Sequence, residues 1–420
     1  MRDPALYLAV YDMAAADVLV ASECRHHFVA RDGPHPVTGE SREPLDAPLS
    51  LSVLLVKPTP AAGAFLAAWA TALAADTSAS AAKTFEATML PEPRAQRVAT
   101  LQPVPGGSWE AARVQDLFPR YPPRVNDGTQ AAPYWAFGGS LGLGLLPVGL
   151  FANGHTFFTA DLPALYRLKP YTVHAGAEAR GAPAARARLR AAGLWADAPE
   201  YYSEGLLLAL NLIVPAALAD ATEPLKQAAR GVSAAHAELL RWQLARIAEG
   251  FAVAAAAGRA LVLPRLLCSC DPDAVRNCSA GEVTLPFPCA LDVAADVAAL
   301  DAAGWAYREA GLLDAPRFKD APGGDHPRLV LRLCADAKAK KVAGADAAPP
   351  CGSGADELPA GGSVAAVAKA LRRHDDARVV QLDLFGPGLI AGFDKKKDAD
   401  AFNAAFVDIA RLDVPPIAVL

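Results

Sequence analysis

The chain has 420 residues, of which 53% are hydrophobic, and its formal net charge is −5. This length favours two domains of ordinary size, each able to bury a core of its own. The mild acidic balance gives no electrostatic reason to expect a nucleic-acid partner, which calls for a concentrated basic face. No segment reaches the roughly 20 strongly apolar residues of a membrane span, and no hydrophobic signal region follows Met1, so the sequence by itself predicts a soluble chain.

The first half of the chain predicts several strands and one clear amphipathic helix. This helix begins at Pro60, and the fourfold spacing of Phe65 and Trp69 gives it one apolar face. A second helix is expected over residues 109–118, whereas the mixed composition of residues 78–107 predicts irregular structure. Short apolar runs predict strands at residues 17–22, 50–56, 132–137, 145–151 and 170–175.

The second half of the chain predicts a regular alternation of helices and strands. A long helix is expected from near Ser233 to Gly258, because Leu240, Leu244 and Phe251 form an apolar stripe. Further strands are predicted at residues 260–263, 328–333 and 378–384, and further helices at residues 363–373 and 397–412.

This alternation favours an α/β protein whose mainly parallel sheet is covered on both faces. We place one domain at residues 1–215 and a second α/β domain at residues 216–420. Within the second domain, residues 335–362 are rich in Ala, Pro, Gly and Lys and predict a flexible insert.

The cysteines are spread unevenly, and four of the seven lie between residues 268 and 289. A zinc site usually has paired Cys-x-x-Cys spacing with histidine, which Cys268-Ser-Cys270 fits poorly. Disulfides in an oxidising compartment are favoured, with free thiols and a metal site as the open alternatives. The sequon at Asn277 can accept a glycan only if the chain enters the secretory pathway.

Two short motifs have both a functional and a plain structural interpretation. The glycine-rich run at residues 138–147 fails the dinucleotide fingerprint, because Pro147 stands where the third glycine belongs. It predicts a tight turn between strands. Asp271-Pro-Asp273 offers two carboxylates to a divalent cation, but the intervening proline favours a turn.

Two histidines and an arginine-rich helix are the candidate functional residues that spacing suggests. His155 and His174 each follow an apolar strand-like segment, and residues at strand ends often line the site of an α/β protein. A single histidine is more often a packing residue, so both interpretations stay open. Arg186, Arg188 and Arg190 occupy alternate positions near a helix start, as an anion clamp or a solvated face.

Residues 144–202 contain several blocks of sequence whose order along the chain matches that of a known protein family. The blocks are Leu146-Pro147, Gly154-His155-Thr156-Phe157-Phe158, Pro170-Tyr171-Thr172-Val173-His174, the three arginines and Pro199-Glu200-Tyr201-Tyr202. In this order they resemble the nucleotide-diphospho-sugar transferase domain of plant and algal extensin arabinosyltransferases. Less complete matches extend the resemblance upstream to residues 1–19 and 109–117, and downstream to residues 236–292.

The resemblance implies a fold and a reaction. The fold is an incomplete nucleotide-sugar-binding domain of the GT-A kind, followed by a second, Rossmann-like α/β domain. The reaction is transfer of an arabinose-like pentose or a hexose from a UDP-sugar to a cell-wall glycoprotein or polysaccharide acceptor. Mn²⁺ or Mg²⁺ would be the cofactor, because the carboxylates of the family's DxD motif bridge such a cation to the diphosphate.

The resemblance also implies roles for single residues and a location. His174 would be a metal ligand, and Glu110 or Asp116 would act as the base or contact the acceptor. The donor and its phosphates would be contacted by His155, Arg186, Arg188 and Arg190. The family implies the lumenal side of the Golgi, in a single-pass membrane protein whose anchor this chain does not include.

Several positions depart from the family pattern. The DxD motif would precede Met1 and is absent, so the domain is expected to lack its N-terminal part. Ser50 and Ser52 stand in place of the asparagine and glycine of an N-x-G motif. Ala185 and Ala187 replace a lysine and a histidine. These departures keep open an alternative, a non-catalytic sugar-binding or scaffolding relative that has lost the metal site.

Overall fold

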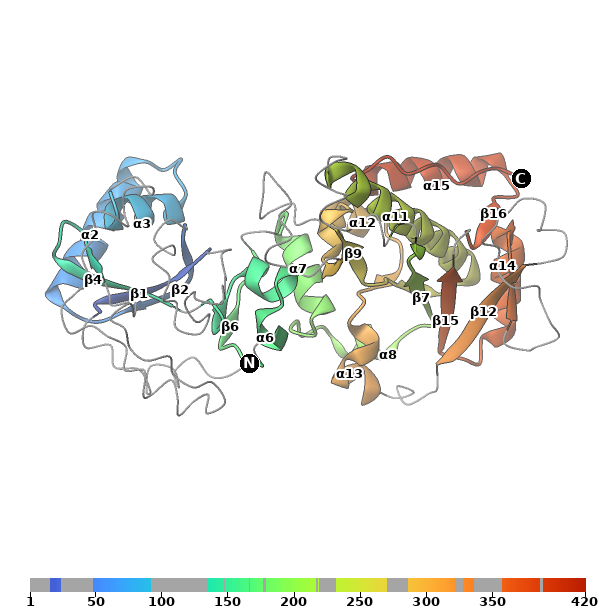
Figure 1. The fold of residues 1–420 in the computed structure, drawn as a ribbon, viewed down its shortest axis with the longest axis horizontal. Coiled ribbons are helices and arrows are strands. Elements are labelled where there is room, and N and C mark those ends of the chain that lie inside the picture. Colours follow the sequence, from blue (N-terminus) through green and yellow to red (C-terminus); the bar gives the residue numbers. More distant parts are fainter. Residues whose placement is uncertain are drawn as a thin grey trace. The chain divides into compact units, whose positions relative to one another are not determined.

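The computed structural model (Figure 1) divides the chain into two compact units, Met1–Glu178 and Ala179–Leu420. It describes residues 16–23, 48–91, 134–146, 148–165, 167–176, 179–216, 218, 232–269, 286–321, 328–335, 357–385 and 388–420. The helix expected at residues 109–118 and the Asp271-Pro-Asp273 triplet lie outside these residues.

The first unit contains a mixed four-stranded sheet in the order β2-β1-β4-β3. Its strands are β1 (Val18–Ser22), β2 (Leu49–Val56), β3 (Tyr134–Ala136) and β4 (Leu141–Leu145). Strand β1 runs parallel to β4 and antiparallel to β2, and β3 is antiparallel to β4. The predicted strands at residues 17–22, 50–56 and 132–137 are therefore confirmed within the described residues.

Helices α2 (Pro60–Ala75) and α3 (Ala81–Met89) pack on this sheet. Helix α2 begins as predicted, with Pro60 in its first turn and the Thr59 side chain accepting a hydrogen bond from a backbone N–H. Its Phe65 ring lies edge-on to Phe85 of α3, with centroids 5.2 Å apart. The prediction of irregular structure missed α3, which Ser80 caps and whose buried Phe85 and Met89 recur at helical spacing.

The glycine-rich run forms both a turn and a strand. Gly138 and Gly139 have positive φ angles of 66° and 82°, which glycine adopts without strain, so the predicted turn is present. Gly142 and Gly144, however, lie within β4. The prediction of one strand over residues 145–151 was wrong, because β4 pairs with β1 through Leu143, Gly144 and Leu145 and ends there.

A second, two-stranded parallel sheet of the first unit pairs β5 (Phe151–Ala152) with β6 (Thr172–Val173). The Phe151 and Tyr171 rings stack beside this pair, with centroids 5.6 Å apart. A π-helical turn, η2 (His155–Thr159), and the short helix α6 (Leu162–Leu165) connect the two strands. The strand predicted at residues 170–175 is present, but only two residues long.

The second unit is built on a six-stranded sheet in the order β11-β8-β7-β15-β12-β13, and every pairing in it is parallel. Its strands are β7 (Leu207–Ile213), β8 (Ala260–Val262), β11 (Tyr307–Arg308), β12 (Leu329–Ala335), β13 (Glu357–Ala360) and β15 (Val379–Phe385). The prediction of a parallel sheet from the strand–helix alternation is confirmed for this unit.

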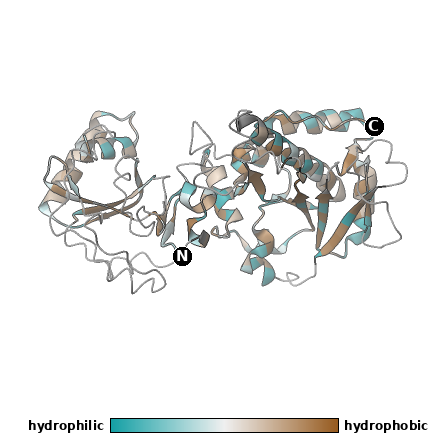
Figure 2. Ribbon diagram, in the orientation of Figure 1, coloured by the Kyte–Doolittle hydropathy of each residue, from teal (hydrophilic) through white to brown (hydrophobic). Residues whose placement is uncertain are grey.

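The hydrophobic core on one face of this sheet includes residues of three helices, α11 (Val232–Ala257), α14 (Val364–Leu371) and α15 (Lys396–Ile409). Figure 2 shows an alternation of hydrophobic and hydrophilic colour along α15. Gly258, with a φ of 70°, ends α11 as predicted. The opposite face packs near its amino end against α8 (Pro199–Ser203), η4 (Leu312–Asp314) and α13 (Pro316–Lys319).

The compact units divide after Glu178, earlier in the chain than the boundary placed at residue 215. The reason is that β7 pairs with β8 and β15 and so belongs to the second sheet. Helix α7 (Ala182–Ala191) packs with α12 (Val297–Ala302), also in the second unit. The expected flexible insert at 335–362 is in part ordered, because β13 pairs with β12 in that sheet.

A disulfide joins Cys268 in β9 (Leu266–Cys268) to Cys289 in β10 (Phe287–Cys289), two antiparallel strands. Cys334 is also disulfide-bonded. The favoured interpretation of the cysteines as disulfides is thus confirmed for these residues. Among the described residues, no helix is both long and apolar enough to span a membrane.

Candidate functional site

Three polar side chains of the first unit follow directly after strands. Glu23 follows β1, Asn153 follows β5 and His174 follows β6; we call these residues the strand-end cluster. The Asn153 side-chain amide donates a hydrogen bond of 3.1 Å to the carbonyl of Ser22, which ties the end of β5 to the end of β1. The carboxyl ends of strands are where α/β proteins commonly bind ligands.

His174 and Glu23 face each other within this cluster. His174 Nδ1 lies 3.7 Å from Glu23 Oε1, and the side chains are 40% and 17% exposed. The His174 ring is thus partly exposed, whereas its Nδ1 atom is buried and makes no hydrogen bond with the residues that the structure describes. The backbone N–H of His174 donates to the carbonyl of Ala152, which holds it at the end of the β5–β6 pair. Gly176 leaves room for the ring, because a Cβ there would lie 3.0 Å from His174 Nε2.

His155 occupies a different environment from His174. Its side chain is completely buried at the start of η2, next to the buried Thr156. The Asn153 side-chain oxygen accepts a hydrogen bond of 2.9 Å from the Thr156 backbone N–H and so fixes this turn. The predicted contact between His155 and a donor stays a prediction, and the residue lies beneath the surface.

The strand-end cluster meets the needs of a divalent cation only in part. Glu23 and His174 supply one carboxylate and one imidazole, both suitable ligands for Mn²⁺. No group of three or more His, Cys, Asp or Glu side chains that could hold a metal occurs among the described residues. The two side chains therefore fit a cation that takes its remaining ligands from phosphate oxygens and water, as Mg²⁺ often does.

The three predicted arginines lie on α7 in the second unit, and each is paired with a carboxylate of that unit. Arg186 Nη2 lies 2.7 Å from Asp301. Arg188 makes two hydrogen bonds of 2.9 Å to Asp292, and both side chains are buried. Their role in donor binding stays a prediction, since the guanidinium charges already have acidic partners.

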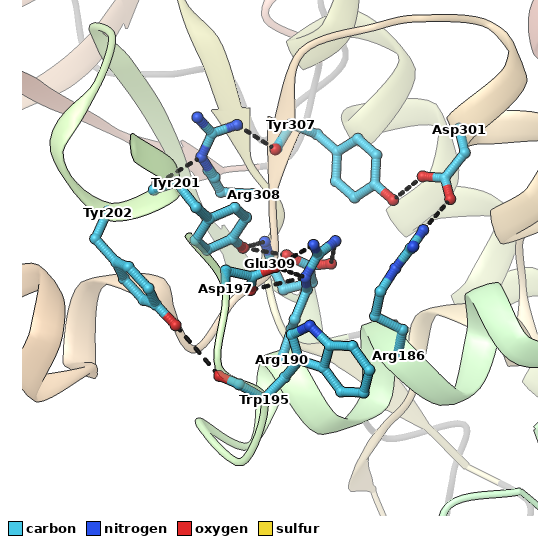
Figure 3. A network of polar contacts seen from close by, with 10 residues as sticks. All are labelled: Arg186, Arg190, Trp195, Asp197, Tyr201, Tyr202, Asp301, Tyr307, Arg308 and Glu309. Atoms are coloured by element: carbon cyan, nitrogen blue, oxygen red, sulfur yellow. Dashed lines mark hydrogen bonds and ion pairs between the residues drawn. The ribbon is translucent and has the colours of Figure 1, made fainter. Parts of the chain in front are cut away.

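Arg190 belongs to a larger polar network (Figure 3). Its guanidinium pairs with Asp197 and lies 3.4 Å from Glu309. Burial acts to lower the pKa of Arg190, but its hydrogen bond to Asp197 and the charge of Glu309 outweigh burial and raise it. The Arg190 side chain therefore stays charged and anchors the segment after α7 to the residue that follows β11.

Tyr201 of α8 is the centre of this network. Its hydroxyl donates a hydrogen bond to Glu309, and its ring lies between Arg190 and Arg308, whose Cζ atoms are 5.0 and 4.8 Å from the ring centroid. Burial and the neighbouring Glu309 charge raise the pKa of the Tyr201 hydroxyl. Burial also raises the pKa of Glu309. The Pro199–Ser203 block thus has a structural role in the second unit.

The structure places the predicted residues in separate units. His155 and His174 lie in the first unit and the arginines in the second, while Glu110 and Asp116 lie outside the described residues. Sequence reasoning missed Glu23, although its place directly after the strand at residues 17–22 was a usable signal. It also missed Glu309, for which the sequence offers no comparable signal.

Comparison with known proteins adds one partial similarity. No protein-family model matches the chain, and no solved structure matches it. Arabinosyltransferase XEG113 of Arabidopsis thaliana is 30% identical over 167 residues, which are 38% of this chain and 24% of the relative. The match thus spans about a quarter of the relative's length. This similarity supports a glycosyltransferase-like relationship and leaves the donor and acceptor open.

Proposed function

We propose that this chain is a glycosyltransferase that moves an arabinose-like pentose or a hexose from a UDP-sugar to a cell-wall glycoprotein or polysaccharide acceptor. The observation that carries this proposal is the 30% identity over 167 residues to an enzyme named as an arabinosyltransferase. The α/β architecture of both units is compatible with it.

The strand-end cluster is our proposed donor side of the site. His174 is partly exposed at the end of a strand, and Glu23 lies beside it. Such a position supports ligand binding because backbone and side-chain groups at strand ends face outward from the sheet. Asn153 is a positioning residue, since it joins the ends of β1 and β5.

Glu23 and His174 are the residues that would hold Mn²⁺ or Mg²⁺. When bound, the cation would neutralise charge on the diphosphate leaving group. Glu23 Oε1 and His174 Nδ1, the two atoms that face each other, are the ligand atoms to expect, and Gly176 keeps space on the Nε2 side of the ring. The contact of His155 with the donor is part of the same proposal, and its side chain is buried. The phosphate contacts of the α7 arginines are a separate proposal for the second unit, where each arginine is paired with a carboxylate.

We place this activity on the lumenal side of the Golgi. The disulfide between Cys268 and Cys289 supports an oxidising compartment of this kind, because such bonds are rare in the cytosol.

The test is UDP release by the 420-residue chain, with Mn²⁺ and a panel of UDP-pentoses and UDP-hexoses, in the presence of oligosaccharide and glycopeptide acceptors. His174→Ala should abolish release, and Glu23→Gln should reduce it at least about tenfold if each removes one metal ligand. His374→Ala, a half-buried histidine in the second unit, is the control and should leave release unchanged. Absence of release with every donor would overturn the catalytic proposal.

A second candidate function is a non-catalytic sugar-binding or scaffolding role. The small number of metal ligands favours it, because no third His, Cys, Asp or Glu side chain completes a metal site with Glu23 and His174 in the described part of the chain. It is also favoured by Ser50, whose hydroxyl donates to Ser52 at 3.0 Å, in place of the family's N-x-G. Binding of a UDP-sugar without any UDP release would select this role.

A further inference from the structure

Within the described residues, helices cover one face of the six-stranded sheet over only half of its length. At its amino end, Leu207, Ala209 and Val379 are buried against α8, η4 and α13. Towards the carboxyl ends of β7 and β12, the same face carries exposed side chains, including Asn211 and Arg332. Parallel sheets normally have both faces covered, so this carboxyl half calls for an occupant.

The exposed half carries a row of polar side chains across four neighbouring strands. The strand register aligns Asn211 with Asp383, Asp383 with Arg332, and Arg332 with Glu357, so we call these four residues the polar row. Strands lie about 4.8 Å apart, so the row extends over roughly 14 Å. This length suits an extended chain of several polar groups better than a single small molecule.

Three residues of the polar row, Asn211, Asp383 and Arg332, have hydrogen-bonding capacity left over. Asp383 Oδ1 accepts hydrogen bonds from Asn211 at 2.9 Å and from Gln381 at 3.2 Å. Its second oxygen, and the side-chain oxygen of Asn211, accept none from the residues the structure describes. The Arg332 guanidinium, between two acidic neighbours in the register, likewise forms no ion pair in the described part of the chain.

We propose that the polar row binds the glycan part of the acceptor. Planar amide, carboxylate and guanidinium groups at regular spacing complement the alternating donor and acceptor character of sugar hydroxyls. A protein partner fits less well, because the centres of protein interfaces are depleted in charged residues. The choice of a glycan as the ligand rests on the proposed glycosyltransferase function. The alignment of the four residues in the polar row comes from the strand register and does not depend on that function.

The test is calorimetric titration of the full chain with arabinotetraose, xylotetraose and cellotetraose, without nucleotide or metal. At least one oligosaccharide should bind, and Arg332→Ala and Asp383→Ala should each weaken that binding about tenfold. Arg332 is exposed and unpaired, so its replacement should leave the thermal unfolding midpoint unchanged. Arg373→Ala and Asp408→Ala, exposed residues away from this face, are matched controls and should bind like the parent chain.

The proposal would be overturned if Arg332→Ala and Asp383→Ala bound the oligosaccharide as tightly as the parent chain. It would also be overturned if none of the three oligosaccharides bound. A concentration-dependent dimer that Arg332→Ala abolishes would also overturn it, in favour of a second copy of the chain as occupant. UDP release measured in parallel separates the two proposals. Release without oligosaccharide binding refutes only the polar-row proposal, and binding without release refutes only the catalytic one.

Discussion

The guanidinium of Arg188 meets the carboxylate of Asp292 through two hydrogen bonds of 2.9 Å, with both side chains nearly inaccessible to solvent. The pair joins α7 to the short helix η3 (Leu291–Val293), about a hundred residues apart in the chain. Asp292→Ala should lower the free energy of unfolding by about 3–5 kcal/mol, because it removes the buried carboxylate that accepts two hydrogen bonds from the buried Arg188 guanidinium.

The double variant Arg188→Met with Asp292→Leu is the matched comparison for this pair. It removes both charges, so it should cost less than the two single changes added together. Urea unfolding followed by tryptophan fluorescence measures each value. A loss below about 1 kcal/mol for Asp292→Ala would contradict the structural role given to this pair.

Tyr201→Phe should destabilise the second unit by about 1–3 kcal/mol, because the buried Glu309 then loses a hydrogen-bond donor. Tyr307→Phe is the control. Its hydroxyl also donates to a carboxylate, that of Asp301 at 2.6 Å, but near the surface where water can replace it. Thermal or urea unfolding of both variants should rank Tyr201→Phe as the more harmful, and the reverse order would contradict the network in Figure 3.

Glu249 of α11 gives the second unit a pH dependence. Burial raises the pKa of its carboxyl from 4.5 to about 7, despite the opposing effect of Arg246 at 2.8 Å and of the backbone N–H of Leu389. The folded protein therefore binds this proton more tightly than the unfolded chain. Its stabilising contribution is fully present below about pH 4.5 and is lost as the pH rises towards 7, by an amount on the order of 3 kcal/mol.

Glu249→Gln removes this titration while keeping a side chain of the same shape. The free energy of unfolding of the parent chain relative to this variant should fall between pH 5 and pH 8. Urea unfolding at a series of pH values measures the difference. A difference that is constant or that grows with pH would show that burial does not control this carboxyl.

Gly176→Ala tests the position of His174 without removing a functional group. The added Cβ would lie 3.0 Å from His174 Nε2 and should displace the ring, lowering UDP release about tenfold. Gly63→Ala is the matched control, because a Cβ there meets nothing within 4 Å, and alanine should favour α2 slightly. Equal activity of the two variants would argue against a role for the His174 ring.

Replacing both Cys268 and Cys289 by serine should lower the free energy of unfolding by about 3 kcal/mol, the value expected for a loop of this size. The bond spans a sequence separation of 21 residues and links two short strands that pack against α11. Urea unfolding under non-reducing conditions measures the loss. A double variant as stable as the parent chain would show that the bond is not needed to hold these strands.

The sequence predicted those parts of the fold that depend on neighbours in the chain. The fourfold spacing of Phe65 and Trp69 located α2, and the stripe ending before Gly258 located α11, because a helix face is set by local periodicity. Local rules misjudged the glycine-rich run, where β4 exists because its leucines pair with β1. They also missed β13, because its segment is rich in Ala, Pro, Gly and Lys, which predicts a flexible loop. The strand forms because it pairs with the edge of β12.

The candidate site divides in the same way. The sequence by itself determined that His174 follows a strand and that arginines alternate on one helix, since both are matters of order along the chain. Only the tertiary structure decided that Glu23 faces His174, that Asp292 pairs with Arg188, and that Asn211 and Arg332 of the polar row are exposed. These relationships join residues far apart in sequence, and their partners are fixed by strand pairing and helix packing, which no local pattern encodes.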